Sequence, residues 1–246
     1  MTQSQQQWHY LQPALDIRIF AYDFLRRTFL HEPAASYLET VAAAGFIEHF
    51  PFAGENKAIR QGVHEVQDYL QTNNATDAKT YSQLHWDYTR LFIGPYQLPA
   101  PLWESAYVSE KRLLFQESTF HVRCEYAQYG FLAPNHHKEA DDHLGLELDF
   151  MYQLACLASE KGHEQPAAVR EILNNSQLFL TNHLLNWVPA LARDIRQHAS
   201  TGFYRGMASL LTGYLALDVQ ILGELLSNEV FCDPPLLAVN SPPILK

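Results

Sequence analysis

Histidine and carboxylate side chains gather in one short segment, His136-His-Lys-Glu-Ala-Asp-Asp-His143. His143 and Glu147 are four residues apart, so on a helix they share one face. Convergent imidazole and carboxylate groups are the ligands that divalent metals use. One hypothesis is therefore a metal-dependent hydrolase or a metal-binding protein, with candidate ligands His136, His137, Asp141, His143 and Glu147. The absence of an H-E-x-x-H motif and of a second helix with an E-x-x-H partner weakens it.

The same segment also has a structural interpretation. Asp141 or Asp142 is well placed to cap a long helix that runs to about Lys161, and His143 then packs and donates a hydrogen bond. Alternatively, an Asp142 carboxylate that is not occupied by capping can pair with a guanidinium group in bidentate geometry. The sequence leaves both uses of Asp142 open.

A second unusual segment is apolar, aromatic and stiffened by proline, and it connects two helical patterns between Tyr88 and Tyr107. Gly94 and Pro95 end the first pattern, and further prolines prevent its continuation. Loops normally run over the surface and are polar. An apolar loop over residues 93–104 is therefore either packed into the core or part of a groove for an apolar partner, and we favour the groove. Its expected wall comprises Tyr88, Leu91, Phe92, Tyr96, Trp103 and Tyr107.

Motifs for other chemistry are missing. Neither G-x-x-x-x-G-K-[ST] nor G-x-G-x-x-G occurs, and G-x-S-x-G is absent. We therefore expect no enzyme activity and no cofactor. Leu25-Arg-Arg-Thr-Phe-Leu30 is similar to a twin-arginine export consensus, but no uninterrupted apolar stretch follows it, so it is expected to be part of a helix rather than an export leader.

Bulk composition excludes several classes of partner. A formal charge of −10 over 246 residues argues against nucleic acid and against an anionic membrane surface. With 47% hydrophobic residues the chain can bury a sizeable core, and no apolar stretch approaches transmembrane length. Three scattered cysteines predict free buried thiols, and the N-terminus lacks leader features. These observations predict a cytoplasmic protein that is not embedded in a membrane.

Helical periodicity runs through almost the whole chain, so we expect an all-α fold, a single globular helical bundle of roughly nine to eleven helices. The expected domain covers residues 1–227, with a linker at 131–140 and a proline-rich tail at 228–246. Pro13 is expected in the first turn of the first helix. Further helices are expected at residues 33–45, 57–71, from 76 or 77, 105–130, 141 or 142 to 161, 166–185, 187–198 and 202–226.

Four segments carry a resemblance to a known family. The segment "RLFIGPYQLPAPLWESAY" is similar to the LF(V/I)GP…P-x-x-W-x-S signature of the TorD/DmsD family, and its pattern looks closest to the DmsD members. The segment from Glu139 to Met151 resembles the E-P-x-D-H motif of that family. "FLTNHLLNWVPAL" and "FYRGMASLLTGYLALDVQIL" resemble its H-L-x-x-W segment and its last helix. The four segments follow in the family's order between about Leu84 and Leu226.

The resemblance implies a function. It indicates a cytoplasmic chaperone that binds the twin-arginine signal peptide of a molybdenum-containing oxidoreductase, assists cofactor insertion and proofreads the precursor before Tat export. Tat translocase components are further candidate partners. A dimerising adaptor is a second alternative to the chaperone, and both a monomer and a domain-swapped dimer are compatible with the resemblance.

The resemblance also assigns a site. It adds Asp142 and His143, which match the family's Asp-His pair, to the aromatic wall as the polar end of a peptide-binding surface. The chain departs from the family pattern at Ala140, where the family has proline. Tyr88 and Tyr96 replace tryptophan of the DmsD relatives, and Leu102 replaces proline.

Overall fold

The computed structural model describes residues 3–43, 45–74, 77–95, 97–109, 117–132 and 139–227. It confirms the all-α prediction, because these residues form helices and no β-strand. The helices are α1 (Gln3–Phe29), α2 (Ala35–Ala42), α3 (Lys57–Thr72), α4 (Ala78–Tyr88), α5 (Ser105–Val108), α6 (Glu117–Gln128), α7 (Leu144–Lys161), α8 (Pro166–Phe179), α9 (Leu185–His198) and α10 (Gly202–Leu226). The expected tail at 228–246 and most of the expected linker lie outside the described residues.

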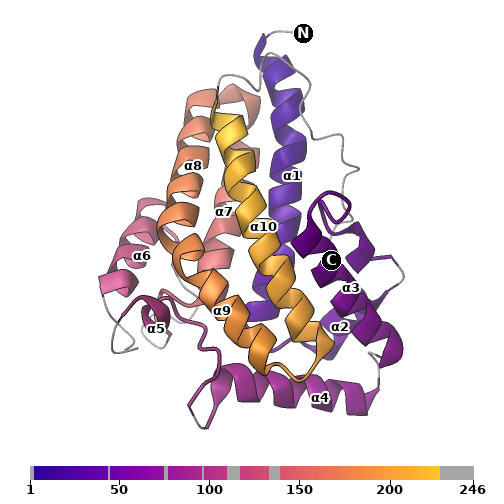
Figure 1. Cartoon of the computed structure of the whole chain (residues 1–246). Coiled ribbons are helices and arrows are strands. Elements are labelled where there is room, and N and C mark those ends of the chain that lie inside the picture. Colours follow the sequence, from indigo (N-terminus) through magenta and orange to yellow (C-terminus); the bar gives the residue numbers. More distant parts are fainter. Residues whose placement is uncertain are drawn as a thin grey trace.

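Helices α1, α7, α8 and α10 run side by side along the length of the molecule, and α4 lies across its lower end (Figure 1). Short 3-10 turns occur at Ile47–His49 and Gly162–Glu164, and π-helical turns occur at Thr89–Ile93 and Leu180–Leu184. The second π turn joins α8 to α9 without a break, so the two expected helices form one continuous helical path. In this view α4 lies below the connection between α9 and α10 (Figure 1), and the Asp87 carboxylate of α4 accepts from the Thr201 amide of that connection at 2.8 Å.

The contact between α3 and α10 is unusually close because glycines face each other. A Cβ atom added at Gly62 would lie 2.6 Å from the carbonyl oxygen of Gly206, which is far too short for a real contact. The two backbones therefore touch only because neither residue has a side chain. By length and apolar composition α10 could span a membrane, but 56% of its most apolar window is buried inside the protein. It is the core helix of this bundle.

An ion pair is buried in the same core. The Arg18 guanidinium of α1 donates to Asp218 of α10 at 2.8 and 3.3 Å, and the Tyr22 hydroxyl donates to the same carboxylate at 2.6 Å. Arg18 and Asp218 are both fully buried. A buried charge is tolerated when it is paired and hydrogen-bonded, so this pair fixes the register of α1 against α10.

Two local expectations were wrong. Pro13 lies inside α1 rather than in its first turn, because the helix already begins at Gln3. Partly buried Trp8 and Leu11 pack against the core and extend the apolar face in front of the proline. Cys124 is exposed and Cys156 is partly exposed, so the two described thiols are free but not buried; Cys232 lies outside the described residues.

Candidate functional site

The two segments singled out in the sequence lie against each other in the fold. Trp103 and His143 form an isolated antiparallel β-bridge. The amide of Leu144 donates to the carbonyl of Leu102 at 2.8 Å, and the amide of Glu104 donates to the carbonyl of Asp142 at 3.0 Å. We call this paired region, residues 102–105 with 141–144, the junction. Side chains along an extended segment alternate between two sides, so the junction has an inner and an outer face.

Asp142 belongs to the inner face. It has no solvent exposure, and its carboxylate accepts hydrogen bonds from the Ser105 amide at 2.8 Å and the Thr119 hydroxyl at 2.9 Å. The expectation that Asp141 or Asp142 caps α7 was wrong, because His143 is the N-cap and its Nδ1 accepts from the Gly145 amide at 3.1 Å. The carboxylate of Asp142 instead ties the junction to the start of α6, and it is enclosed rather than available at a surface.

His143 is buried, and burial, followed by the electrostatic influence of His31, lowers the pKa of its imidazole to about 3. A neutral ring can accept the hydrogen bond that caps α7, whereas a protonated ring cannot. The indole of Trp103 meets the imidazole edge-to-face at 5.4 Å. His143 is therefore a neutral structural residue that packs against the Trp103 ring.

Two more carboxyl groups lie on the inner side. Glu104 is buried and is 2.9 Å from Nδ1 of His183, while fully buried Glu147 accepts from Nε1 of Trp187 at 3.2 Å. Burial, and then the negative charges of Glu104 and Asp142, raise the pKa of Glu147 well above its ordinary value. Burial and these neighbouring negative charges thus favour the protonated, neutral form of Glu147.

The proposed metal ligands do not come together. Within the described ranges no group of three or more His, Cys, Asp or Glu side chains could hold a metal ion. Asp141 is bound by Arg123 at 2.6 Å, while His143 caps a helix and Glu147 lies in the core. His136 and His137 lie outside the described residues. The three described candidates therefore point to different partners, and the arrangement does not favour a metal centre.

Part of the expected aromatic wall is core. Leu91 and Phe92 are 0% and 1% exposed, and Phe92 packs edge-to-face against Phe29, Tyr88 and Tyr204. The expectation of an open position was wrong for these two residues, because the π-helical turn at Thr89–Ile93 directs them inward while it leaves Ile93 exposed. Tyr96 lies outside the described residues.

The outer face of the junction is different. Trp103 and Tyr107 are partly exposed. The indole Nε1 of Trp103 donates to Oε1 of Glu139 at 2.8 Å, which places a carboxylate at the edge of an exposed aromatic ring. Tyr107 lies over Trp187, with the ring centroids 5.6 Å apart. An aromatic surface with a carboxylate at its edge suits a side chain that is both apolar and cationic, as arginine is.

Neither Glu139, which lies on this outer surface, nor Glu32, which contacts His85 of α4, was singled out by the sequence pattern. Glu139 opens the His-Asp segment, and its position in the family-like motif could have singled it out. Glu32 lies in the connection between α1 and α2 and gave no signal, because it is far from the junction in sequence. Both carboxylates act on the same group: burial, and then the charges of Glu32 and Glu139, raise the pKa of the Tyr88 phenol.

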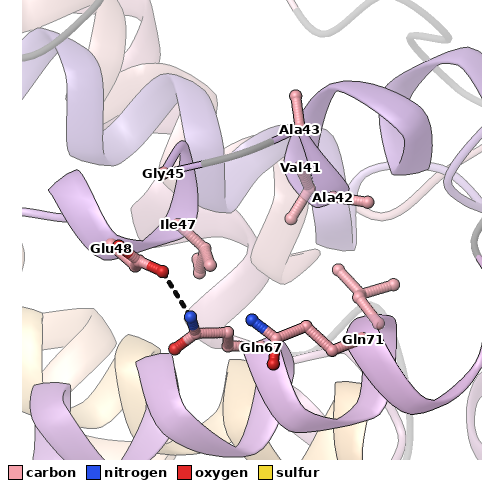
Figure 2. Close-up of a pocket in the computed structure, with 9 residues that line it drawn as sticks. Val41, Ala42, Ala43, Gly45, Ile47, Glu48, Gln67 and Gln71 are labelled. Atoms are coloured by element: carbon pink, nitrogen blue, oxygen red, sulfur yellow. Dashed lines mark hydrogen bonds between the residues drawn. The ribbon is translucent and has the colours of Figure 1, made fainter.

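The described residues also line several cavities. One of about 300 Å³ lies between α2, the turn at Ile47–His49 and α3 (Figure 2). In Figure 2 Gln67 of α3 faces Glu48 across the cavity and donates a hydrogen bond to it. Another, of about 350 Å³, adjoins the junction on its inner side and is lined by Glu104 and His183. In the first cavity the Glu48 carboxylate is bound by Gln67, and in the second the Glu104 carboxylate is bound by His183.

Comparison with known proteins agrees with the sequence motifs. Residues 54–193 match the family described as nitrate reductase delta subunit. The chain is 33% identical over 174 residues to the chaperone protein TorD of Photobacterium profundum, covering 70% of this chain and 78% of the relative. It is 28% identical to TorD of Vibrio parahaemolyticus, covering 80% and 90%. It is 31% identical to the Tat proofreading chaperone DmsD of Salmonella typhi, covering 54% and 59%.

The chain belongs to the TorD/DmsD family. It is accordingly a chaperone of molybdoenzyme maturation and not an enzyme. The matches named TorD cover more of the chain than the match named DmsD. The matched residues 54–193 include the apolar segment between Tyr88 and Tyr107, the junction and all of α7.

Arg26 and Arg27, which are similar to a twin-arginine motif, are bound by carboxylates of the protein itself. Both lie inside α1 and form ion pairs with Asp23, at 2.5 and 2.9 Å, and Arg26 also reaches Asp149 at 3.2 Å. Their guanidinium groups are thus bound within the protein's own surface. They form part of the chaperone's packing between α1 and α7.

Proposed function

We propose that this TorD/DmsD-family chaperone binds the twin-arginine signal peptide of a molybdenum-containing oxidoreductase in the cytoplasm. It would hold the precursor while the cofactor is inserted and would delay its presentation to the Tat translocase. Such a leader has a basic Arg-Arg segment followed by an apolar stretch. The receiving surface must therefore offer apolar area next to carboxylate groups.

The observation that carries the proposal is the pairing of Trp103 with Glu139 on the outer face of the junction. The 2.8 Å hydrogen bond fixes the indole and the carboxylate in one orientation before any ligand arrives. Because a ring held in place loses little freedom on binding, the surface is preorganised for a guanidinium that stacks on the indole and pairs with the carboxylate. Tyr107 and exposed Val108 continue the apolar area beyond Trp103.

Apolar and charged groups are expected to contribute very different free energies to leader binding. Burying about 400 Å² of apolar leader surface contributes roughly 10 kcal/mol at about 25 cal/mol per Å², before the cost of ordering the peptide. A partly exposed carboxylate–guanidinium pair contributes only about 0.2–1 kcal/mol. Affinity should thus come from the aromatic surface, and the carboxylates should select arginine and set the register. The chain's net charge of −10 supports attraction of a cationic leader.

Calorimetric titration with a twin-arginine leader peptide tests the proposal. Two control peptides carry Lys-Lys in place of Arg-Arg, or a scrambled apolar stretch. We expect saturable binding that scrambling abolishes and that Lys-Lys weakens, since lysine lacks the planar fork of donors. The absence of binding to any leader encoded beside a molybdoenzyme would contradict the proposal.

Oligomeric state is a separate part of the proposal. A monomer is expected to bind one leader, and a domain-swapped dimer to bind two. Size-exclusion chromatography at two protein concentrations, with and without leader, distinguishes these stoichiometries. Co-purification with a Tat translocase component that depends on bound leader would extend the partner set.

A further inference from the structure

A cavity lies beside the junction, where α5, the start of α6 and the π-helical turn at Leu180–Leu184 meet. Its volume is about 350 Å³, and residues of all three elements line it. Val108 of α5 is one of them, and its side chain is 48% exposed. Because Val108 also follows Tyr107 on the outer surface, the mouth of the cavity adjoins the surface proposed to receive the leader.

The most buried residues that line the cavity form a carboxylate–imidazole pair. Glu104 and His183 are only 4% and 7% exposed, and Oε2 of Glu104 lies 2.9 Å from Nδ1 of His183. Burying a carboxylate is costly unless it is paired, so this contact holds both side chains in place. An imidazole has a second nitrogen, Nε2, that can bond to a ligand while Nδ1 remains with Glu104. His183 also belongs to a π-helical turn, a distortion that is frequent at functional sites.

A hydroxyl group without a partner belongs to the wall of the same cavity. Oγ of Ser118, in the first turn of α6, is buried and makes no hydrogen bond in the described part of the chain. Buried polar groups in native proteins almost always have a partner. A hydrogen-bond donor that enters the cavity would supply the missing one.

The charged groups around the cavity favour a cationic ligand. Glu117 and His121 are 87% and 57% exposed, with Oε1 and Nε2 3.8 Å apart, so they lie nearer to solvent than Glu104 does. Two carboxylates thus line the cavity, whereas none of its described lining residues is Lys or Arg. Carboxylates, hydroxyls and neutral imidazoles accept hydrogen bonds, and guanidinium and ammonium groups only donate them. The cavity therefore suits a basic side chain.

We propose that this cavity binds a second basic side chain of the leader, in addition to the arginine that stacks on Trp103. The inference rests on the proposed leader-binding function and deepens it. The leader crosses Val108 on its way from one subsite to the other. Its first basic group pairs with Glu139, and its second bonds to Ser118 and His183. The basic segment of the leader is thus recognised at two places on the chaperone.

Calorimetry arranged as double-mutant cycles tests the assignment. The peptides are a twin-arginine leader and a series in which each basic residue in turn is replaced by glutamine. The proteins are the wild type, Ser118→Ala and Glu139→Gln, with Ser36→Ala as the matched control. Ser36 is exposed and is the second residue of α2, as Ser118 is the second residue of α6.

We expect Ser118→Ala to bind the leader about 3- to 10-fold more weakly than Ser36→Ala does, as for one lost hydrogen bond. In urea unfolding Ser118→Ala should be at least as stable as the wild type, because the hydroxyl has no partner in the free protein and alanine is the better helix former. Weaker binding without a loss of stability distinguishes a ligand contact from a structural role.

One basic residue of the leader should couple to Ser118. Its replacement weakens binding to the wild type but causes little further loss in Ser118→Ala, and the leader residue that couples to Glu139 is a different one. His183→Gln is a second variant of the cavity, and its side-chain amide can still donate to Glu104. It should couple to the same leader residue as Ser118→Ala does.

Three results overturn the inference while leaving the proposed function intact. One is that Ser118→Ala and His183→Gln bind every peptide as Ser36→Ala does. Another is that they weaken binding of all peptides equally, or couple to the same leader residue as Glu139→Gln. The third is a loss of stability in Ser118→Ala, which would make the hydroxyl a structural group. If the wild type binds no leader, both the function and the inference fail, so the two failures are distinguishable.

Discussion

Both faces of the junction carry carboxylate side chains, but those on the inner face are buried and the one on the outer face lies beside a partly exposed aromatic ring. On the inner face Asp142 and Glu147 are fully buried, and their oxygens serve Ser105, Thr119 and Trp187. On the outer face Glu139 bonds to a partly exposed tryptophan. A carboxylate enclosed among the protein's own donors stabilises the fold, whereas one at the surface can exchange water for a cationic ligand.

This contrast shows how one sequence motif serves two purposes. Within the stretch from Leu102 to Ser105, the backbone binds the segment before α7, and Trp103 alone turns toward the outside. The rigidity of the inner face is what holds the outer face in a fixed shape. Substitutions on the inner face should therefore lower the stability of the protein, whereas substitutions on the outer face should weaken leader binding.

The largest effect is expected for Asp142→Ala. Removing the carboxylate leaves the buried Ser105 amide and Thr119 hydroxyl without their acceptor, which should lower the free energy of unfolding by roughly 2–4 kcal/mol. Urea unfolding followed by circular dichroism measures the loss. Asp142→Asn, which keeps one acceptor oxygen, should lose clearly less. If Asp142→Ala were as stable as the wild type but did not bind leader, Asp142 would belong to the binding surface after all.

Trp103→Ala addresses the outer face. Because Trp103 is partly exposed and its indole is the centre of the proposed surface, we expect leader binding to weaken by about 2 kcal/mol, with the helical circular dichroism unchanged. Phe120→Ala, which removes an exposed aromatic residue from α6, is the control and should bind normally. Unfolding of Trp103→Ala would show instead that this residue is part of the core.

Glu147→Gln tests the buried carboxyl group through its pH dependence. The pKa of Glu147 is raised in the folded state, so above the ordinary carboxyl pKa the unfolded chain loses a proton that the folded chain keeps. The contribution of Glu147 to wild-type stability should thus fall as pH rises, with a limiting slope of about 1.4 kcal/mol per pH unit. Gln has no proton to lose and still accepts from Trp187, so its stability relative to the wild type should increase between pH 5 and pH 8. A constant difference across this range would contradict a raised pKa of Glu147.

The smallest change concerns His143→Asn at mildly acidic pH. The pKa of His143 is lowered to about 3, so below about pH 6.5 the unfolded chain binds a proton that the folded chain does not. This contribution to stability is lost as pH falls from about 6.5 toward 3. Asparagine still caps α7 and does not titrate, so His143→Asn should be less sensitive to acid than the wild type. Urea unfolding at pH 7 and pH 5 compares the two slopes; equal slopes would mean that His143 titrates normally.

The helical architecture could be predicted from the sequence because apolar periodicity and end signals are local. The expected helix at residues 57–71 is α3, which ends at Thr72, and the helix at 202–226 is α10 with the same bounds. Asn56 and Asp77 accept the capping hydrogen bonds of α3 and α4, as residues of these types do. The cap of α7 was predicted incorrectly, because Asp142 is drawn away by Ser105 and Thr119, which are distant in sequence.

The sequence by itself determined the all-α class, the family and the two segments that form the junction, because these depend on residue order and short-range spacing. Only the tertiary structure decided which side of the junction faces solvent. As a result Asp142 is a buried residue that stabilises the fold, and Glu139 lies beside Trp103 on the outer face. It also brought Leu30 against Gly145 of α7 and Glu32 to within 2.8 Å of His85 in α4. Burial and long-range proximity set what a carboxylate can do, and neither is encoded in the local pattern around it.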